Sequence, residues 1–241
     1  MDYTSLSEGG TGASYGAAFN APIGEQLAFR ASGILQNAPG AYDNLQRQER
    51  DSDSFRKWSA RGTLRWEPSD RFNASLLYLK QQSHLNDVLV ATNPDGRLEN
   101  GNKPGPSFIN FGFSMANADL RYRLDRWGTV VYQFNWQTKS TRGNIDAGIA
   151  ATGSQGIQSL FANLFVEVKG NAHELRLVSP EGGRWDWIAG FFQRDYVASI
   201  LTLVGPSAAP GAISGGIDPL NAKETAFYGE LVRRFGSHWE A

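Results

Sequence analysis

The chain has no cysteine, no long apolar run and almost no net charge, and each absence excludes a class of protein. Without cysteine there can be no disulfide framework, thiolate metal site or cysteine nucleophile. Its most apolar windows, such as Val197 to Val204, are far shorter than the roughly 18 residues that a transmembrane helix requires. The formal net charge of -1 at pH 7 removes the usual electrostatic reason to expect a nucleic-acid partner.

Residues with the spacing of a catalytic or metal site are also missing. The histidines His84, His173 and His238 lie far apart in the sequence, and none has the spacing of a zinc site. The segment Gly9 to Ser14 superficially resembles a phosphate-binding loop, but it lacks the lysine and opens a strand where that loop requires a helix. We therefore predict no catalytic residue, no metal ion and no cofactor, and we do not expect an enzyme.

What the chain does contain is glycine and aromatic residues, which favour strands and tight turns. Apolar and polar side chains alternate with a period of two, the period of a strand with two different faces. In Trp58–Trp66, for example, Leu64 lies on the apolar face and Arg61 and Arg65 lie on the other. The same alternation recurs in Gln26–Gly33, Arg71–Tyr78, Ala118–Leu124, Val130–Trp136, His173–Leu177, Trp185–Phe191 and Phe227–Leu231.

The connections between these segments alternate between short and long. Short turns are expected at residues 23–25, 67–70, 125–126, 180–183 and 236–238. Long connections are expected over Asn37–Ser52, Leu85–Phe113, Ser140–Gly170 and Leu201–Asn221. Outer-membrane β-barrels have this layout, with short periplasmic turns and long extracellular loops. A soluble β-sandwich also alternates, but long loops at only one end are unusual for it.

The predicted fold is therefore all-β. We expect an antiparallel meander of about nine to ten strands, which forms an open part of a transmembrane up-and-down β-barrel. The apolar face would meet hydrocarbon, and the polar face would meet water or protein inside the lumen. Aromatic residues near strand ends would form the interfacial girdles. They are Trp58, Trp66, Phe72, Trp127, Trp136, Trp185 and Trp239.

Blocks of sequence in a definite order carry a family resemblance. The first runs from Gly9 to Asn44 and contains the motif Asn20-Ala21-Pro22-Ile23 ahead of a strand. The second is His173–Pro180 followed by Trp187–Phe192, and the third is Ala226–Glu230. Together these blocks resemble the barrel hairpins of TonB-dependent outer-membrane receptors, and they cover most of the chain.

The resemblance implies energy-coupled uptake of a scarce ligand such as a ferric siderophore, cobalamin or a glycan. It also implies the partners of such receptors, which are outer-membrane lipid, a plug domain and the TonB complex. Family members have an N-terminal plug and about 22 strands. We therefore expect residues 1–241 to be one partial barrel domain without the plug, and the missing signal peptide at Met1 to mark a fragment. The alternatives are a passive porin-like channel and a soluble β-rich binding module.

Two sets of residues are candidates for contacts inside such a receptor. The first set is predicted to face the lumen, where it would contact the plug or attract an anionic ligand, or simply meet water. It consists of Arg30, Arg61, Arg65, Arg121, Arg123, Glu174 and Arg176. For Glu174 and Arg176 the alternative is pairing with Arg194, Asp195 or Glu230 on neighbouring strands. The second set, Phe108, Phe111 and Phe113, ends a long connection and is predicted to contact ligand, because binding residues concentrate on loops.

Overall fold

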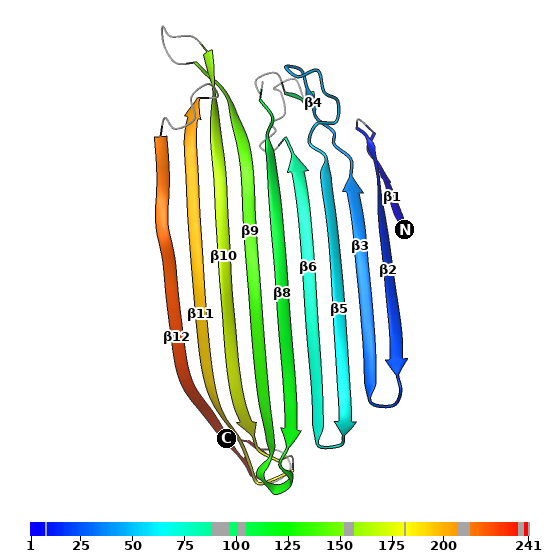
Figure 1. Cartoon of the computed structure of the whole chain (residues 1–241), viewed down its shortest axis with the longest axis vertical. Coiled ribbons are helices and arrows are strands. Elements are labelled where there is room, and N and C mark those ends of the chain that lie inside the picture. The colour runs from blue at the N-terminus through cyan, green and yellow to red at the C-terminus, as the bar shows by residue number, and fades with distance from the viewer. Residues whose placement is uncertain are drawn as a thin grey trace.

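One antiparallel sheet contains most of the described chain (Figure 1). The computed structural model describes residues 1–7, 9–87, 97–100, 105–151, 157–180, 182–206, 213–235 and 239–240. In chain order the sheet consists of β1 (Asp2–Ser5), β2 (Thr11–Ile23), β3 (Leu27–Ala38), β5 (Phe55–Ser69), β6 (Phe72–Asn86), β8 (Phe108–Arg123), β9 (Thr129–Ala151), β10 (Ile157–Val178), β11 (Trp185–Pro206), β12 (Ile213–Phe235) and β13 (Trp239–Glu240). Each strand pairs with the next along the chain, which confirms the predicted all-β meander. A separate parallel pair joins β4 (Asp43–Asn44) to β7 (Glu99–Asn100).

The strands are longer than the sequence pattern predicted. Strands β9 and β12 have 23 residues each, and β10 and β11 have 22. Consequently most of the predicted long connections Ser140–Gly170 and Leu201–Asn221 is strand, and those two predictions are wrong over most of their length. Backbone groups must be paired whether or not a strand alternates in polarity, and hairpin pairing satisfies them. Alternation therefore marks only the part of each strand whose faces meet different surroundings.

The short turns all lie at one end of the sheet, opposite the long connections (Figure 1). Gly24 and Gly182 have positive φ angles of 74° and 81°, which suit glycine in a tight turn. The next turn contains η1 (Asp125–Trp127) followed by Gly128, where a Cβ atom would collide with the carbonyl oxygen of Val178. The predicted turns at 23–25, 125–126 and 180–183 are confirmed. The turn predicted at 67–70 lies at Asp70 and Arg71, because β5 continues to Ser69, and 236–238 lies outside the described residues. Within the described chain, no helix has the length and apolar character needed to cross a membrane.

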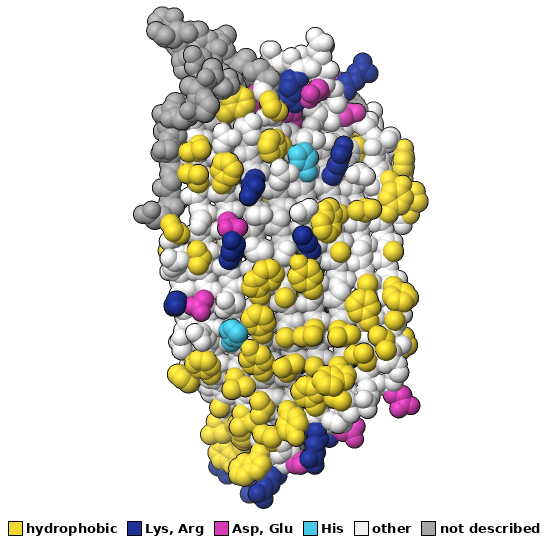
Figure 2. Space-filling model, viewed as in Figure 1, with side chains coloured by type: hydrophobic (Ala, Val, Ile, Leu, Met, Phe, Trp, Pro, Cys, Tyr) yellow, Lys and Arg dark blue, Asp and Glu magenta, His cyan; other side chains and the backbone are white. Residues whose placement is uncertain are grey.

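One face of the sheet, here called the apolar face, presents rows of hydrophobic side chains. Cross-strand pairing aligns Leu27, Trp66, Ala74, Leu120 and Tyr132 in one such row. Figure 2 shows this face, where hydrophobic side chains form a band over the half of the sheet nearest the short turns. Charged side chains lie beyond both edges of this apolar band. The arrangement is that of a surface that faces hydrocarbon between two aqueous layers.

The opposite face, here called the polar face, carries the alternate residues of every strand. One of its rows contains Arg65, Ser75, Asp119, Gln133 and Glu174. Because residues that pair directly across antiparallel strands share a face, the register assigns each side chain to one face without ambiguity.

The sheet is a single layer and has almost no hydrophobic core. Among the described residues, only Ala74 and Val131 are buried hydrophobic side chains. Phe227 and Leu231 are 81% and 63% exposed, and many other apolar side chains are exposed with them. A contiguous apolar surface of this kind requires lipid or another protein to cover it.

Candidate functional site

A group of hydrogen-bonded polar side chains lies on the polar face of β8 and β9, near the short turns. Asp119 accepts a hydrogen bond from Nε of Arg121 at 2.8 Å and from Nε2 of Gln133 at 2.6 Å. Asp119 and Arg121 are two residues apart on one strand and therefore point to the same face. The carboxylate is thus held from its own strand and from the neighbouring one.

A second group lies beside it on β10 and β12. Glu174 accepts a hydrogen bond from the hydroxyl of Tyr228, and its Oε1 lies 3.9 Å from Nε of Arg176. That distance is too long for a hydrogen bond, and the buried Nε of Arg176 has no partner in the described chain. The Nε–H group of Arg176 is therefore left without a hydrogen bond within the described chain.

All seven residues predicted to face the lumen lie on the polar face. In the strand register, Arg30 pairs with Thr63, Arg61 with Leu79, and Arg123 with Thr129. Arg30 donates to Oδ1 of Asn20 at 3.1 Å, and Arg65 forms an exposed ion pair of 2.6 Å with Glu67. Their contact with a plug domain or a ligand remains a prediction.

The cross-strand partners of Glu174 and Arg176 differ from those expected. Arg194 lies 3.4 Å from Glu224, and Asp195 lies on the apolar face, 3.7 Å from Lys223. No ion pair joins Glu230 to this group in the described part of the chain. The alternative, pairing of Glu174 and Arg176 with Arg194, Asp195 or Glu230, is therefore not found among the described residues.

Sequence reasoning missed three members of these groups, namely Asp119, Gln133 and Tyr228. Alternation already placed Asp119 and Gln133 on a polar face, so the available signal was their parity. For Tyr228 no such signal was usable, because an aromatic residue in a strand reads as apolar. The register that brings it near Glu174 is a property of the assembled sheet.

The aromatic trio of the predicted loop lies within β8, so its assignment to a loop is wrong. The chain remains paired here because β6 and β9 extend alongside it. Phe111 and Phe113 are on the polar face, where Nζ of Lys139 lies 5.8 Å from the ring centre of Phe113. Phe108 is on the opposite face and stacks on His84 with ring centres 5.9 Å apart. Their role in ligand binding remains a prediction.

The polar-face aromatics belong to a wider patch near the long connections. Phe113 shares a row with Val168, and Phe111 shares the next row with Val166 and Ile200. The half of the polar face nearest the long connections is therefore partly apolar, whereas the half nearest the short turns is charged.

A compact hydrogen-bonded group, here called the loop cluster, lies at the long connections. It is made of polar side chains and the backbone of one glycine. Its members are Asn44, Arg47, Asp87, Gly105 and Asp146. Arg47 contacts Oδ2 of Asp87 at 2.8 Å and donates to the carbonyl oxygen of Gly105 at 2.6 Å. Asn44 donates to Asp87 at 3.2 Å, and Asp146 accepts from the backbone N–H of Gly105 at 2.9 Å.

The charge on Arg47 is stabilised within the loop cluster. Burial lowers the pKa of Arg47, but hydrogen bonds and charge interactions with Glu49 and Asp87 outweigh burial, so that the net pKa is raised. The side chain of Asp87 has no exposed surface, and its Oδ1 has no hydrogen-bond partner in the described chain. The cluster thus holds a guanidinium and a carboxylate largely away from solvent.

Acidic residues of the same connection have structural partners. Asp53 accepts hydrogen bonds from the backbone N–H groups of Ala41 and Tyr42 at 2.7 and 2.8 Å. Glu49 pairs with Arg47 at 2.8 Å. Across the described residues, no group of histidine and acidic side chains has the arrangement of a metal site.

Comparison with known proteins identifies similar solved structures. No family model and no curated protein matches the sequence. The ferric yersiniabactin uptake receptor FyuA from Yersinia pestis superposes with a TM-score of 0.64 at 13% identity, over 91% of this chain and 41% of FyuA. The ferric preacinetobactin receptor BauA from Acinetobacter baumannii gives 0.65 at 11% identity, over 98% and 40%. The FpvAI–pyocin S2 complex gives 0.64 at 11% identity, over 92% and 34%.

The open sheet of this chain matches part of the fold of these solved structures. These neighbours are TonB-dependent receptor barrels, so the fold suggested by the sequence resemblance is confirmed. The chain spans less than half the length of each of them. At 11–13% identity the likeness is one of fold, and it leaves ligand and partners to be argued from the chain's own residues.

Proposed function

We propose that this chain is part of the barrel of an outer-membrane receptor, not an enzyme, and that the receptor takes up a scarce ligand in an energy-coupled step. The first candidate ligand is a ferric siderophore. The proposed partners are outer-membrane lipid around the apolar face, a plug domain inside the barrel and the TonB complex. The observation that carries the proposal is the division of one barrel-type sheet into an apolar band and a charged inner face.

The fold likeness supports the choice of ligand. FyuA and BauA are by name receptors for ferric complexes, and the chain aligns with both over more than nine-tenths of its length. The polar face adds a chemical argument. Arg65 and Arg121 are paired with Glu67 and Asp119, but Arg30, Arg61 and Arg123 form no ion pair with a described residue and leave positive charge on this face. Such a surface attracts anions, and anionic metal chelates are one such class.

The polar face also offers two environments along the path of a ligand. Near the long connections, Phe111 and Phe113 provide apolar contact surface, and Lys139 adds a cation over the ring of Phe113. Near the short turns, Arg176 has an unpartnered buried donor. We propose that ligand meets the aromatic patch first, and that Arg176 contacts a carboxylate of the plug.

Uptake by cells that carry the complete gene product tests the proposal. Cells starved of iron are supplied with a panel of ⁵⁵Fe-loaded siderophores, with and without an uncoupler of the proton-motive force. We expect saturable uptake of at least one chelate, and we expect the uncoupler to abolish it. Uptake that does not saturate and ignores the uncoupler would favour the passive channel, and recovery of the protein in the soluble fraction would favour the soluble binding module.

Matched charge variants sharpen this test. Arg176→Gln removes the free donor from the polar face and is expected to lower the uptake rate about tenfold, the effect of one charge-assisted hydrogen bond. Lys223→Gln removes a cation from the apolar face, where the side chain is 86% exposed, and should leave uptake unchanged. Equal effects of the two substitutions would contradict an inward role for Arg176.

A further inference from the structure

Several cations on the apolar face have no acidic partner. Lys80, Arg56 and Arg142 lie between the apolar band and the long connections, and none forms an ion pair with a described residue. The acids on this part of the face, Glu167 and Asp195, already have lysine partners at 2.9 and 3.7 Å. Unpaired positive charge therefore remains next to the surface that would meet lipid.

The strand register locates the edge of the apolar band that is nearest the long connections. On β9 the last large aromatic is Trp136, whose row runs through Ala116 and Tyr78 to Gly62 on β5. On β5 the last aromatic of this face is Trp58, which lies four residues nearer the long connections than Gly62. Barrel strands tilt by roughly 40°, and three strand spacings of about 4.8 Å then shift a level boundary by roughly four residues. The sloping edge of the band thus corresponds to a level membrane boundary.

The three cations lie at different distances beyond this edge, toward the long connections. Lys80 lies at the boundary on β6, and Arg56 lies two residues beyond Trp58 on β5. Arg142 lies six residues beyond Trp136 on β9, which is about 20 Å along the strand and about 15 Å in height at a tilt of roughly 40°. The positive charge therefore extends well past the thin layer of an ordinary phospholipid headgroup, which adds only about 5–8 Å on each side of the hydrocarbon.

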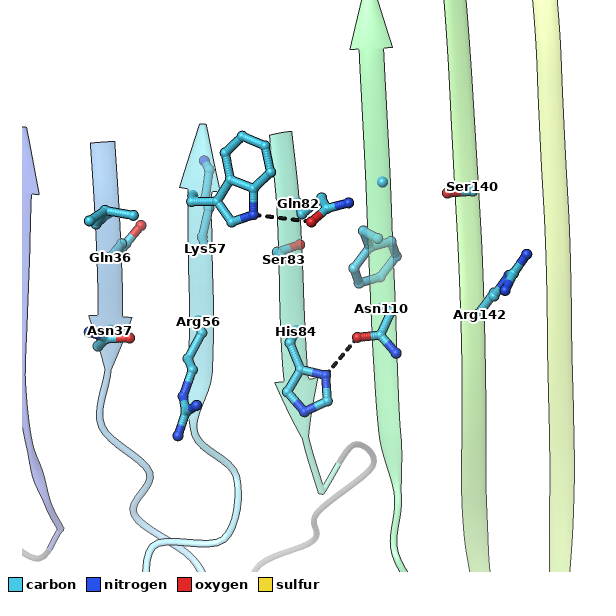
Figure 3. A pocket seen from close by; sticks show the side chains of 14 residues that line it. Gln36, Asn37, Arg56, Lys57, Gln82, Ser83, His84, Asn110, Ser140 and Arg142 are labelled. Atoms are coloured by element: carbon cyan, nitrogen blue, oxygen red, sulfur yellow. Dashed lines mark hydrogen bonds between the residues drawn. The ribbon is translucent and has the colours of Figure 1, made fainter. Parts of the chain in front are cut away.

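An open depression of about 620 Å³ lies among these cations (Figure 3). Arg56 and Arg142 lie on its two sides in Figure 3, with His84 and Asn110 between them. Gly112 and Ser140 line it with small side chains, and an added Cβ at Gly112 would lie 2.6 Å from Oγ of Ser140. The glycine therefore helps to keep the depression open.

The polar groups of the depression are held in place by one another. Oδ1 of Asn110 lies 2.6 Å from Nδ1 of His84, which leaves the amide nitrogen of Asn110 free to donate outward. Nε1 of Trp58 donates to Oε1 of Gln82 at 3.1 Å, which leaves the amide nitrogen of Gln82 free to donate as well. The site thus combines two guanidinium groups with amide and hydroxyl donors, which is the donor set that phosphate oxygens prefer.

We propose that this depression binds the phosphorylated sugar headgroup of an outer-leaflet glycolipid, whose acyl chains lie on the apolar band below. The inference rests on the proposed position of the barrel in an outer membrane. Charge selects an anionic lipid. The cations extend farther from the apolar band than a phospholipid headgroup reaches, and this favours a long phosphorylated saccharide.

The test measures lipid binding to the complete gene product, isolated from the outer-membrane fraction in mild detergent. The probe is bis-phosphorylated lipid A, and native mass spectrometry reports the bound fraction. The double variant Arg56→Gln/Arg142→Gln should weaken binding about 30-fold, as expected for the loss of two interfacial cations. Arg194→Gln, which removes a guanidinium from the opposite face and outside the depression, is the matched control and should bind as the unmodified protein does.

Further arms separate lipid binding from other causes. Arg56→Lys/Arg142→Lys keeps the charges and should retain most of the affinity, while the heat-dependent gel mobility of each variant checks that its barrel is folded. Dephosphorylated lipid A and phosphatidylglycerol should both bind more weakly than lipid A. Equal binding of either lipid, or unchanged binding by the glutamine variant, would overturn the glycolipid site alone. Recovery of the protein outside the outer membrane would overturn the proposed function as well.

Discussion

At one end of the sheet the apolar side chains of Leu76 and Phe227 are exposed on the outer surface, while at the other end Asp87 and Asp146 are buried. The apolar band has no core of its own and depends on its surroundings. The loop cluster buries charge and depends on its own hydrogen bonds. The two regions therefore respond to opposite changes: the band is damaged by added charge, and the cluster by lost charge.

The largest expected effect is a charge placed in the apolar band. Leu76→Arg should destabilise the barrel in lipid vesicles by about 2–4 kcal/mol, because the guanidinium would lie in hydrocarbon. The next residue, Leu77, points to the polar face, so Leu77→Arg is the matched control and should cost much less. Denaturant unfolding in vesicles measures both variants, and equal costs would show that the faces have been assigned incorrectly.

Loss of a charge from the loop cluster should have the next largest effect. Asp87→Ala removes the buried partner of Arg47 and Asn44, at a cost of about 1–3 kcal/mol that is confined to the long connections. Limited proteolysis should then cleave the connection that carries Arg47 at least fivefold faster, by roughly the same free energy. Asp70→Ala, in an exposed short turn, serves as the control. Unchanged cleavage of the Asp87 variant would show that the cluster does not hold the connections together.

A smaller effect is expected on the polar face. Tyr228→Phe removes the hydroxyl that donates to Glu174 and should cost about 1 kcal/mol, because the site is partly open to water. Tyr122→Phe, on the apolar face, should change the unfolding free energy by only a few tenths of a kcal/mol. If the two substitutions have the same effect on unfolding in vesicles, the hydrogen bond to Glu174 does not contribute.

The smallest effect is expected for an exposed ion pair. Arg65 and Glu67 are 67% and 43% exposed, so Glu67→Gln should cost less than about 1 kcal/mol. Screening should reduce even this cost when the ionic strength is raised to about 1 M. A salt-independent cost from the same unfolding measurement would indicate that Glu67 has a contact beyond this pair.

Much of the sheet could be predicted from the sequence because the two faces have opposite polarity. Alternation in Trp58–Trp66 and Val130–Trp136 located both strands and the face of each residue. The prediction failed where alternation stops, as at the start of Ser140–Gly170, where both faces of β9 are polar and a long connection was predicted. Phe108–Phe113 was misassigned for the same reason, since aromatic residues there occur on both faces of β8.

The loop cluster was beyond the reach of the sequence pattern. Arg47 and Asp87 are 40 positions apart, in segments without periodicity, and nothing local pairs them. Their contact depends on how the segment that carries Arg47 lies against the end of β6 in the tertiary structure. The same holds for Glu174 and Tyr228, which are separated by 54 positions and by the whole of β11.

The sequence by itself determined the all-β class, the short turns and the face to which the charged candidates belong, because these depend on neighbours one to four residues away. Only the tertiary structure decided the register of the strands, and with it the partners of Glu174, the slope of the apolar band and the depression between Arg56 and Arg142. Register is a property of paired strands, in which a shift of one residue exchanges the two faces. For that reason it is set by the assembled sheet and not by any strand alone.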